Sequence, residues 1–427
     1  MSDEARTFGF ETRMLHAGHI PDPYTGSRAV PIYQTTSYVF GSADEAAHLF
    51  ELKQYGNIYT RISNPTAAVF EERIASLENG TGAVAVASGM AAQFGAIMTL
   101  CEPGDDIVAS KHLYGGTVTQ FTHTLKKLGV RTTFVEPDDF DGWEAAITPR
   151  TRMMFVETIG NPLGSIADLE SLAQIAKRHN VPLAVDNTFA SPYLCRPIDW
   201  GATLVIHSAT KFIGGHGTAI GGCVVDSGDF DFSGFPTIAD PSPAYHGMRF
   251  FDTFGHYAFL MKLRAETVRD TGACIAPMNS FLLIQGLETL SVRMDRHVAN
   301  AQAVAEFLDG HKKVSKVHFA GLPGHPHYER AKKYMPKGPG AVMSFDLANG
   351  DREDGKKLIE AFQLFSHLAN VGDAKSLVIH PASTTHQQLS DEELVAGGIS
   401  PGLVRISVGL ETLDDLLWDL DQALAAI

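Results

Sequence analysis

Residues 183–211 read LAVDNTFASPYLCRPIDWGATLVIHSATK. Two short apolar runs lie in this stretch, at residues 183–185 and 204–206. Such runs are typical of strands buried in a parallel sheet. A carboxylate, Asp186, directly follows the first run, and Lys211 lies shortly after the second. Because ligands in these sheets bind at the carboxyl ends of the strands, we expect Asp186 and Lys211 to lie at one ligand site.

The same pattern continues on both sides of this stretch. Further short apolar runs lie at residues 84–87, 107–109, 132–135, 153–156 and 223–225, and segments with helical periodicity separate most of them. This alternation predicts an α/β fold, in which a mostly parallel sheet is covered by helices on both faces.

The pattern changes after about residue 285. Residues 287–307 have the periodicity of a long helix, and strands are predicted at residues 341–347 and 403–408. A last helix begins after Thr412, which is spaced with Asp415 as a capping box. We therefore expect a smaller α+β domain at the C-terminal end.

The chain of 427 residues exceeds what one hydrophobic core usually organises. We predict an irregular N-terminal arm over residues 1–62 that contacts a neighbouring subunit. A large domain over residues 63–285 and a small domain over residues 286–427 follow. Asn64 and Pro65 suit the N-cap and the first position of the helix that opens the large domain.

Composition and charge narrow the classes of function. The net charge of −15 disfavours binding to nucleic-acid phosphates. The chain contains no run of 18 apolar residues, so no membrane helix is predicted. Its first residues lack the apolar centre of a signal peptide. Without a CxxC pair, the cysteines support neither a zinc site nor a redox pair. We expect a cytoplasmic protein with free thiols and no metal; the cysteines are Cys101, Cys195, Cys223 and Cys274.

Lys211 is the first candidate for chemistry. It follows the strand at residues 204–206 and the hydroxyls of Ser208 and Thr210, and glycines come after it. Lysine forms Schiff bases with aldehyde cofactors, and a neighbouring cation or burial lowers its pKa so that it can react. The two hydroxyls can bind a phosphate beside it. A surface lysine in a glycine-rich loop is the alternative, because short motifs give false positives.

Three further candidates end neighbouring strands. Asp186 can lie against the pyridine nitrogen of pyridoxal 5′-phosphate (PLP) and keep it protonated, or it can cap a turn. Ser88, Gly89 and Met90 join a strand to an apolar helix, which is either an anion site or an ordinary tight turn. Tyr114 can stack on a flat ring or pack in the core. Because all these candidates fall at one edge of the predicted sheet, we favour a PLP site.

The chain resembles the PLP-dependent enzymes of cysteine and methionine metabolism over nearly its full length, and several motifs carry this resemblance. These motifs are Tyr59-Thr60-Arg61-Ile62-Ser63-Asn64-Pro65-Thr66, Ala87-Ser88-Gly89-Met90, Leu113-Tyr114-Gly115-Gly116, Asp186-Asn187-Thr188-Phe189, Ser208-Ala209-Thr210-Lys211 and Leu403-Val404-Arg405. Within that family, residues 186–197, 207–222 and 367–388 are most similar to the O-acetylhomoserine sulfhydrylase branch.

The resemblance implies a PLP-dependent transferase fold of the aspartate-aminotransferase type (fold type I) and a role for each matching residue. Lys211, Asp186 and Tyr114 would be catalytic: Lys211 would hold PLP, Asp186 would face the pyridine nitrogen and Tyr114 would stack on the ring. The implied phosphate ligands are Ser88, Gly89, Met90, Ser208 and Thr210, with Tyr59 and Arg61 reaching in from a neighbouring subunit of a homotetramer.

The substrate carboxylate would be held by Arg405, whose guanidinium can bind it through two parallel hydrogen bonds. Asn161 would lie near the ring hydroxyl or the carboxylate, and Tyr59 would also contact substrate. Two positions depart from the family pattern. Asn370, the second expected contact of the substrate carboxylate, stands where relatives often have Ser and can still donate a hydrogen bond. Gly116 stands where methionine γ-lyases typically have Cys.

The resemblance implies γ-replacement on O-acetyl-L-homoserine, in which sulfide or a thiol displaces acetate to give homocysteine or methionine. Cystathionine γ-synthase, cystathionine γ-lyase and methionine γ-lyase activities remain alternatives, because these enzymes share the same central residues and fold does not settle substrate. Serine hydrolase motifs also occur: Ser208–Lys211 fits SxxK without its usual companion motifs, and Gly398-Ile399-Ser400-Pro401-Gly402 fits GxSxG but precedes a predicted strand.

Overall fold

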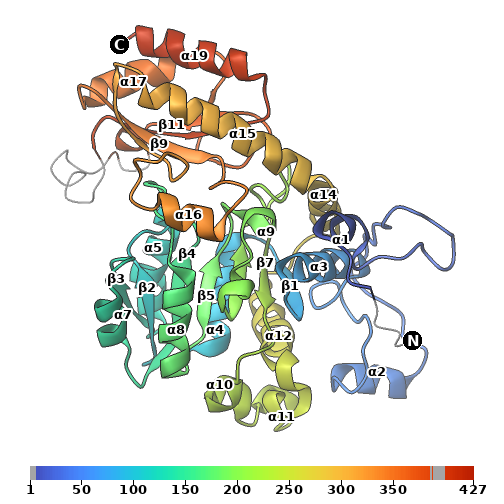
Figure 1. Cartoon of the computed structure of the whole chain (residues 1–427). Coiled ribbons are helices and arrows are strands. Elements are labelled where there is room, and N and C mark those ends of the chain that lie inside the picture. Colours follow the sequence, from blue (N-terminus) through green and yellow to red (C-terminus); the bar gives the residue numbers. More distant parts are fainter. Residues whose placement is uncertain (1–5, 385–386, 388–399) are drawn as a thin grey trace.

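The computed structural model describes residues 6–384, 387 and 400–427. A seven-stranded sheet in the order β1-β7-β6-β5-β4-β2-β3 forms the larger part (Figure 1). The strands are β1 (Gly82–Val86), β2 (Asp106–Ser110), β3 (Arg131–Val135), β4 (Thr151–Glu157), β5 (Leu183–Asp186), β6 (Leu204–His207) and β7 (Gly222–Asp226). The five neighbours from β6 to β3 run parallel, and β7 is antiparallel to both β6 and β1. The predicted mostly parallel sheet is confirmed, and each of the seven apolar runs forms a strand.

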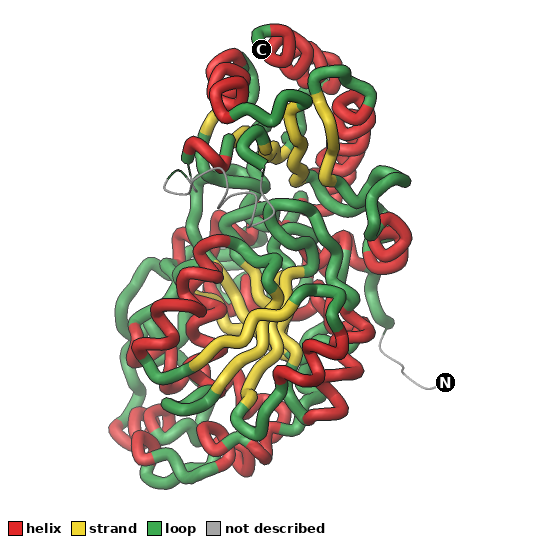
Figure 2. Tube along the Cα trace, turned by 90° about the vertical axis from the view of Figure 1, so that its left-hand side faces the viewer, coloured by secondary structure: helices red, strands yellow, loops and turns green. Residues whose placement is uncertain are grey.

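Helices cover both faces of this sheet (Figure 2). Successive side chains of a strand point to opposite faces, so the apolar strands supply two cores. Helices α3 (Pro65–Glu78) and α8 (Leu169–His179) share one core with Val185 and Val205, while α4 (Gly89–Leu100) and α12 (Ala258–Lys262) share the other with Ile206. Burial on both faces explains why these strands are apolar throughout rather than alternating.

A smaller five-stranded sheet follows in the order β10-β11-β12-β9-β8. Its strands are β8 (Val314–His318), β9 (Val342–Leu347), β10 (Ser366–His367), β11 (Leu377–Ile379) and β12 (Leu403–Ser407). Helices α15 (Leu290–Asp309), α17 (Arg352–Ala361) and α19 (Leu413–Ala425) lie beside it (Figure 1). The expected α+β unit is confirmed, whereas the exact domain boundaries stay predictions.

The long helix expected at residues 287–307 is confirmed as α15, which begins at Leu290 because α14 (Pro277–Leu287) ends just before it. One local prediction about the C-terminal unit is wrong. Thr412 is the N-cap of α19, but its side chain makes no capping hydrogen bond. The Asp415 N–H instead donates to the Thr412 carbonyl at 3.2 Å, so no capping box forms.

The N-terminal arm contains two short helices, α1 (Phe10–His16) and α2 (Ala43–Phe50), which the prediction of an irregular arm lacked. Several large apolar side chains of the arm are solvent-exposed; they include Ile20, Tyr24, Val39, Phe50 and Tyr55. The helix start at Asn64 is confirmed, since its side chain accepts hydrogen bonds from the N–H groups of Thr66 and Ala67.

Short helices make the remaining connections: α5 (Gly115–Thr119), α6 (Leu125–Lys127), α7 (Phe140–Ala146), α9 (Ser191–Leu194), α10 (Pro236–Ala239), α11 (Phe250–Phe254), α13 (Arg269–Thr271) and α16 (Tyr328–Tyr334). Of the helices in the described ranges, none is long and apolar enough to cross a membrane. The same ranges contain no group of three His, Cys, Asp or Glu side chains that could hold a metal ion.

Candidate active site

A cavity of about 270 Å³ lies at the carboxyl ends of the parallel strands, where the smaller sheet meets the larger one. Eleven of the thirteen predicted site residues line it: Ser88, Gly89, Met90, Tyr114, Asn161, Asp186, Ser208, Thr210, Lys211, Asn370 and Arg405. The strand-end rule therefore located the cavity, and the fold brings together residues that are more than 300 positions apart in the chain.

Tyr59 and Arg61 are the two predicted residues that do not line this cavity. Arg61 donates to the carbonyl oxygen of Arg269 at 2.8 Å, and its guanidinium lies 5.4 Å from the centre of the Tyr59 ring. Within one chain, the arm therefore does not complete the site.

Lys211 lies in the turn that follows β6. Its amino group points into the cavity and donates a hydrogen bond to the side-chain oxygen of Asn370. Burial, helped by the positive charge of Arg405, lowers the pKa of Lys211 to about 8, while Asp186 opposes this shift. A substantial fraction of the amine is then neutral near physiological pH, as attack on an aldehyde requires.

Asp186 and Glu157 form a carboxyl pair at the ends of the parallel neighbours β5 and β4. The two residues are register partners, and both line the cavity. The Thr188 N–H donates to Asp186 at 3.0 Å, and its hydroxyl also donates to Asp186. The backbone N–H of Tyr114 donates to Glu157 at 2.6 Å.

Burial raises the pKa of both carboxyl groups. The charge of Asp186 pushes the pKa of Glu157 further up, so that it lies well above the ordinary value. At Asp186 the Thr188 hydrogen bonds and the charges of His207 and Lys211 act in the opposite direction. Ionising both of two adjacent carboxyl groups costs free energy, because their negative charges repel. We therefore assign the proton of the pair to Glu157 and the negative charge to Asp186.

Glu157 is a site residue that the sequence prediction missed. The signal was present, because Glu157 directly follows the apolar run at residues 153–156 and ends a strand as Asp186 does. The strand-end rule that singles out Asp186 applies equally to Glu157.

The N-terminus of α4 supplies anion donors to the same cavity. Ser88 caps the helix by accepting the Ala91 N–H at 3.1 Å, and the first N–H groups of a helix, here those of Gly89 and Met90, have no intrahelical acceptor. A Cβ added at Gly89 would lie 2.6 Å from the Cβ of Ser208, so only glycine fits between the two loops. The Ser208 hydroxyl has no hydrogen-bond partner among the residues described.

These donors fit a phosphorylated aldehyde cofactor. Backbone N–H groups at a helix N-terminus and nearby hydroxyls suit a phosphate. A lysine of lowered pKa suits the aldehyde, and a charged carboxylate suits a protonated pyridine nitrogen. Tyr114, which is 52% exposed, lies at the cavity mouth with an accessible ring that suits stacking on a flat heterocycle.

The cavity also holds a guanidinium. Arg405, on β12, donates to the side-chain oxygen of Asn161 at 3.2 Å. Burial lowers the pKa of Arg405, and the residues that the structure describes supply no carboxylate partner for it. Such a buried, uncompensated cation suits the carboxylate of an incoming molecule.

The alternative hydrolase motif has different surroundings. Ser400 precedes β12, and its hydroxyl donates to Asp346, whereas a hydrolase nucleophile of this type follows a strand and precedes a helix. Gly398 and Ile399 of that motif, and part of the stretch 367–388, lie outside the described residues.

Together, the fold and the cavity define an α/β enzyme built to carry a phosphorylated aldehyde on a lysine. The family model described as Cys/Met metabolism PLP-dependent enzyme matches residues 11–425. The chain belongs to this family, and its cofactor is PLP. The serine hydrolase alternative is therefore wrong.

Individual relatives agree with the family. The chain is 52% identical to the homocysteine synthase of Schizosaccharomyces pombe, over 97% of this chain and 98% of the relative. It is 51% identical to O-acetyl-L-homoserine sulfhydrylase 1 of Thermus thermophilus, over 97% and 100%. A solved structure of a putative O-acetylhomoserine (thiol)-lyase from Campylobacter jejuni, which contains N′-pyridoxyl-lysine-5′-monophosphate, superposes with a TM-score of 0.94 at 41% identity, covering 98% of this chain and all of that one.

Proposed function

We propose that the protein catalyses γ-replacement on O-acetyl-L-homoserine, in which sulfide displaces acetate to give L-homocysteine. The observation that carries this proposal is that Lys211 shares one cavity with an acid and a cation. Asp186 and Arg405 both line this cavity, and both lie near enough to Lys211 to shift its pKa, Arg405 downwards and Asp186 upwards. Relatives named for this reaction match the chain at 45–52% identity over nearly its full length.

The cofactor end of the cavity is assigned as follows. Lys211 would bind the aldehyde, and Asp186, oriented by Thr188, would hold the pyridine nitrogen in its protonated form. Bound in this way, PLP draws electrons from the substrate Cα and acidifies its protons. The phosphate ligands would be Ser88, Gly89, Met90, Ser208 and Thr210.

The substrate end is assigned to Arg405, Asn161 and Asn370, which would hold the α-carboxylate. Once released from the aldehyde by the substrate amine, the Lys211 amino group would take the proton from Cα. A freely rotating lysine amine can then move protons between neighbouring carbons. The Tyr114 hydroxyl would assist proton transfer at the departing acetate.

Tyr59 and Arg61 would complete the phosphate site of a second copy of the chain, and Tyr59 would also contact its substrate. Two features support this arrangement: the two side chains lie outside their own cavity, and the arm around them exposes large apolar side chains. We accordingly propose a homotetramer with shared sites, located in the cytoplasm. Light scattering of the purified protein tests the assembly, and a stable monomer with full activity would contradict it.

One product assay tests the reaction. Purified enzyme is incubated with O-acetyl-L-homoserine, with and without sulfide, and the products are identified by mass spectrometry. Homocysteine formed without 2-oxobutyrate supports γ-replacement, whereas 2-oxobutyrate as the main product indicates γ-elimination. Replacing sulfide by methanethiol shows whether methionine is also formed.

A variant tests the assignment of the lysine. Lys211→Ala should lose turnover together with the absorbance of the bound cofactor, because no other amine is expected to replace it. Borohydride reduction followed by peptide mapping should modify Lys211 in the unaltered enzyme. Turnover retained by Lys211→Ala would contradict the assignment.

A further inference from the structure

Asn161 lies in a tight loop whose two sides are tied to each other. Ile159 and Ile166 pair as an antiparallel bridge, and the Gly160 N–H donates to the Ser165 carbonyl at 2.7 Å. We call residues 158–167 the Asn161 loop. Because residues 159–160 are bonded to residues 165–166, the position of Asn161 depends on the contacts that hold the returning segment at Ile166.

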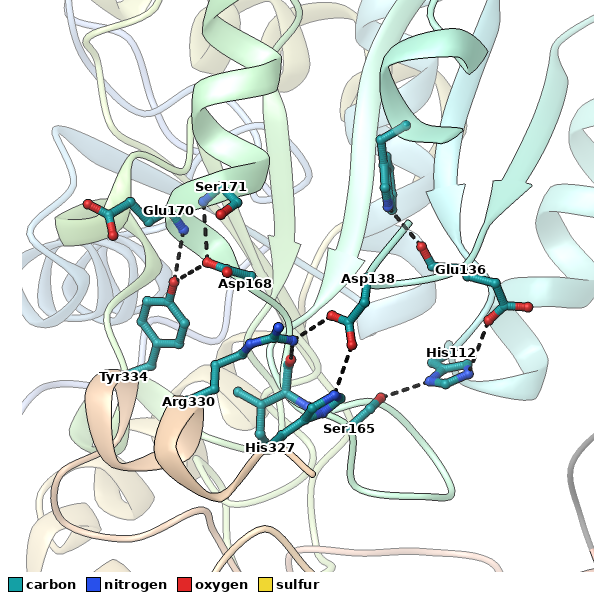
Figure 3. Close-up of polar contacts among 12 residues, drawn as sticks. His112, Glu136, Asp138, Ser165, Asp168, Glu170, Ser171, His327, Arg330 and Tyr334 are labelled. Carbon is teal, nitrogen blue, oxygen red and sulfur yellow. Dashed lines mark hydrogen bonds and ion pairs between the residues drawn. The ribbon is translucent and has the colours of Figure 1, made fainter. Parts of the chain in front are cut away.

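Helix α16 and its N-cap residue His327, which belong to the C-terminal unit, hold this returning segment. His327 accepts the Ile166 N–H on Nδ1 at 2.9 Å, and Arg330 donates to the Ile166 carbonyl at 2.8 Å (Figure 3). Both backbone polar groups of Ile166 are therefore bound by side chains more than 160 positions away in the chain.

Asp138, in the loop after β3, fixes both of these side chains. Its carboxylate contacts His327 Nε2 at 3.0 Å and Arg330 at 2.6 Å (Figure 3). Since His327 Nδ1 accepts from Ile166, the ring proton lies on Nε2 and is donated to Asp138. Partial burial alone would raise the pKa of Asp138, but the hydrogen bond and charge of Arg330 and the hydrogen bond from His327 hold it below the ordinary value.

The loop has a second attachment on the side of Tyr114. His112 Nδ1 lies 2.9 Å from the Ser165 hydroxyl (Figure 3). The Asn161 loop is thus bonded to the segment that carries Tyr114 on one side and to α16 on the other. A loop held at both sides has one position, which is what a binding site needs from a short amide side chain.

We propose that Asp138, His327 and Arg330 are positioning residues for the substrate carboxylate, which hold the Asn161 loop so that Asn161 stays against Arg405. The three side chains do not line the cavity, so they act through the loop. This proposal rests on the proposed function, because it takes Arg405 and Asn161 as the carboxylate site. A small displacement of such a contact residue is enough to weaken binding of the substrate carboxylate.

The main experiment measures binding separately from the reaction. L-Norvaline has the amine and carboxylate of the substrate but no leaving group at Cγ, so its binding can be followed by the change in PLP absorbance. In Asp138→Ala and Arg330→Ala we expect the norvaline Kd and the KM for O-acetyl-L-homoserine to rise about tenfold. The kcat and the PLP Kd should change by less than about threefold, since the reacting atoms are untouched.

Lys333→Ala is the matched control. Lys333 lies on the same helix and bridges it to α8 through Glu170 at 2.6 Å, but it does not contact the Asn161 loop. This variant should change the norvaline Kd by less than about twofold. An equal effect of Lys333→Ala and Arg330→Ala would overturn the proposal, because general docking of α16 would then explain both.

Two substitutions of His327 provide a rescue test that does not depend on Arg330→Ala folding. An asparagine side-chain oxygen can take the place of Nδ1 and accept the Ile166 N–H, so His327→Asn should restore most of the binding lost in His327→Ala. Equal losses, or unchanged Kd values in all the variants, would overturn the proposal. Norvaline binding does not require γ-replacement, so a negative product assay would contradict the proposed function without contradicting this one.

Discussion

Replacing Glu157 tests where the proton of the buried carboxyl pair resides. Our assignment makes Glu157 a neutral acid that accepts the Tyr114 N–H at 2.6 Å. Glutamine has the same shape, stays neutral and keeps an oxygen that can accept this bond. Glu157→Gln should therefore retain kcat/KM within about threefold.

The expected loss of kcat/KM in Glu157→Ala follows from the hydrogen bond that is lost between the Tyr114 N–H and Glu157. Alanine removes the acceptor and leaves the backbone N–H of Tyr114 unsatisfied. An unsatisfied buried donor costs about 1–3 kcal/mol, which corresponds to about a 5- to 150-fold change. Because Tyr114 lies at the cavity, we expect this loss in kcat/KM as its ring shifts.

The assay is steady-state turnover of O-acetyl-L-homoserine with sulfide, combined with the PLP Kd of each apoenzyme. Asp186→Asn serves as the opposite control, since it removes the charge that we assign to Asp186. It should lower kcat/KM far more than Glu157→Gln does. If Glu157→Gln is as damaging as Glu157→Ala, then Glu157 acts as an anion and the proton has been assigned to the wrong residue.

Three further predictions concern the cavity. The pKa of Lys211 near 8 implies that the rate of PLP binding to the apoenzyme rises with pH, because the neutral fraction of the amine grows from about 10% at pH 7 to about 90% at pH 9. Stopped-flow measurement of this rate checks the prediction, and a rate that stays constant between pH 7 and pH 9 would contradict it. Arg405→Ala should lower kcat/KM at least about 30-fold, since loss of a buried charged partner costs about 2–5 kcal/mol, and an unchanged KM would speak against its role. Gly116→Ala would place a Cβ 2.5 Å from the Tyr114 ring and should lower kcat by displacing that ring, while the free energy of unfolding, measured by denaturant titration, changes by less than about 1 kcal/mol.

Much of the larger domain could be predicted because its signals are local. Seven apolar runs mark its seven strands, and Asp186 and Lys211 follow two of them. Asn64 predicts the start of α3 because its side chain makes the N-cap hydrogen bonds itself. The start of α15 at Leu290 and the missing capping bond at Thr412 were not predictable in the same way, since tertiary packing overrides weak local preferences.

By itself, the sequence determined the order of strands and helices, the family and the residues that end the parallel strands. Only the tertiary structure decided which of these meet. Arg405 reaches Asn161 across 244 positions because the smaller sheet packs against the strand ends of the larger one. The pKa of Glu157 is raised because the fold buries its carboxyl group and places Asp186 beside it in the sheet. Hydrogen bonds and charge interactions depend on distance in space, and a sequence pattern records distance only along the chain.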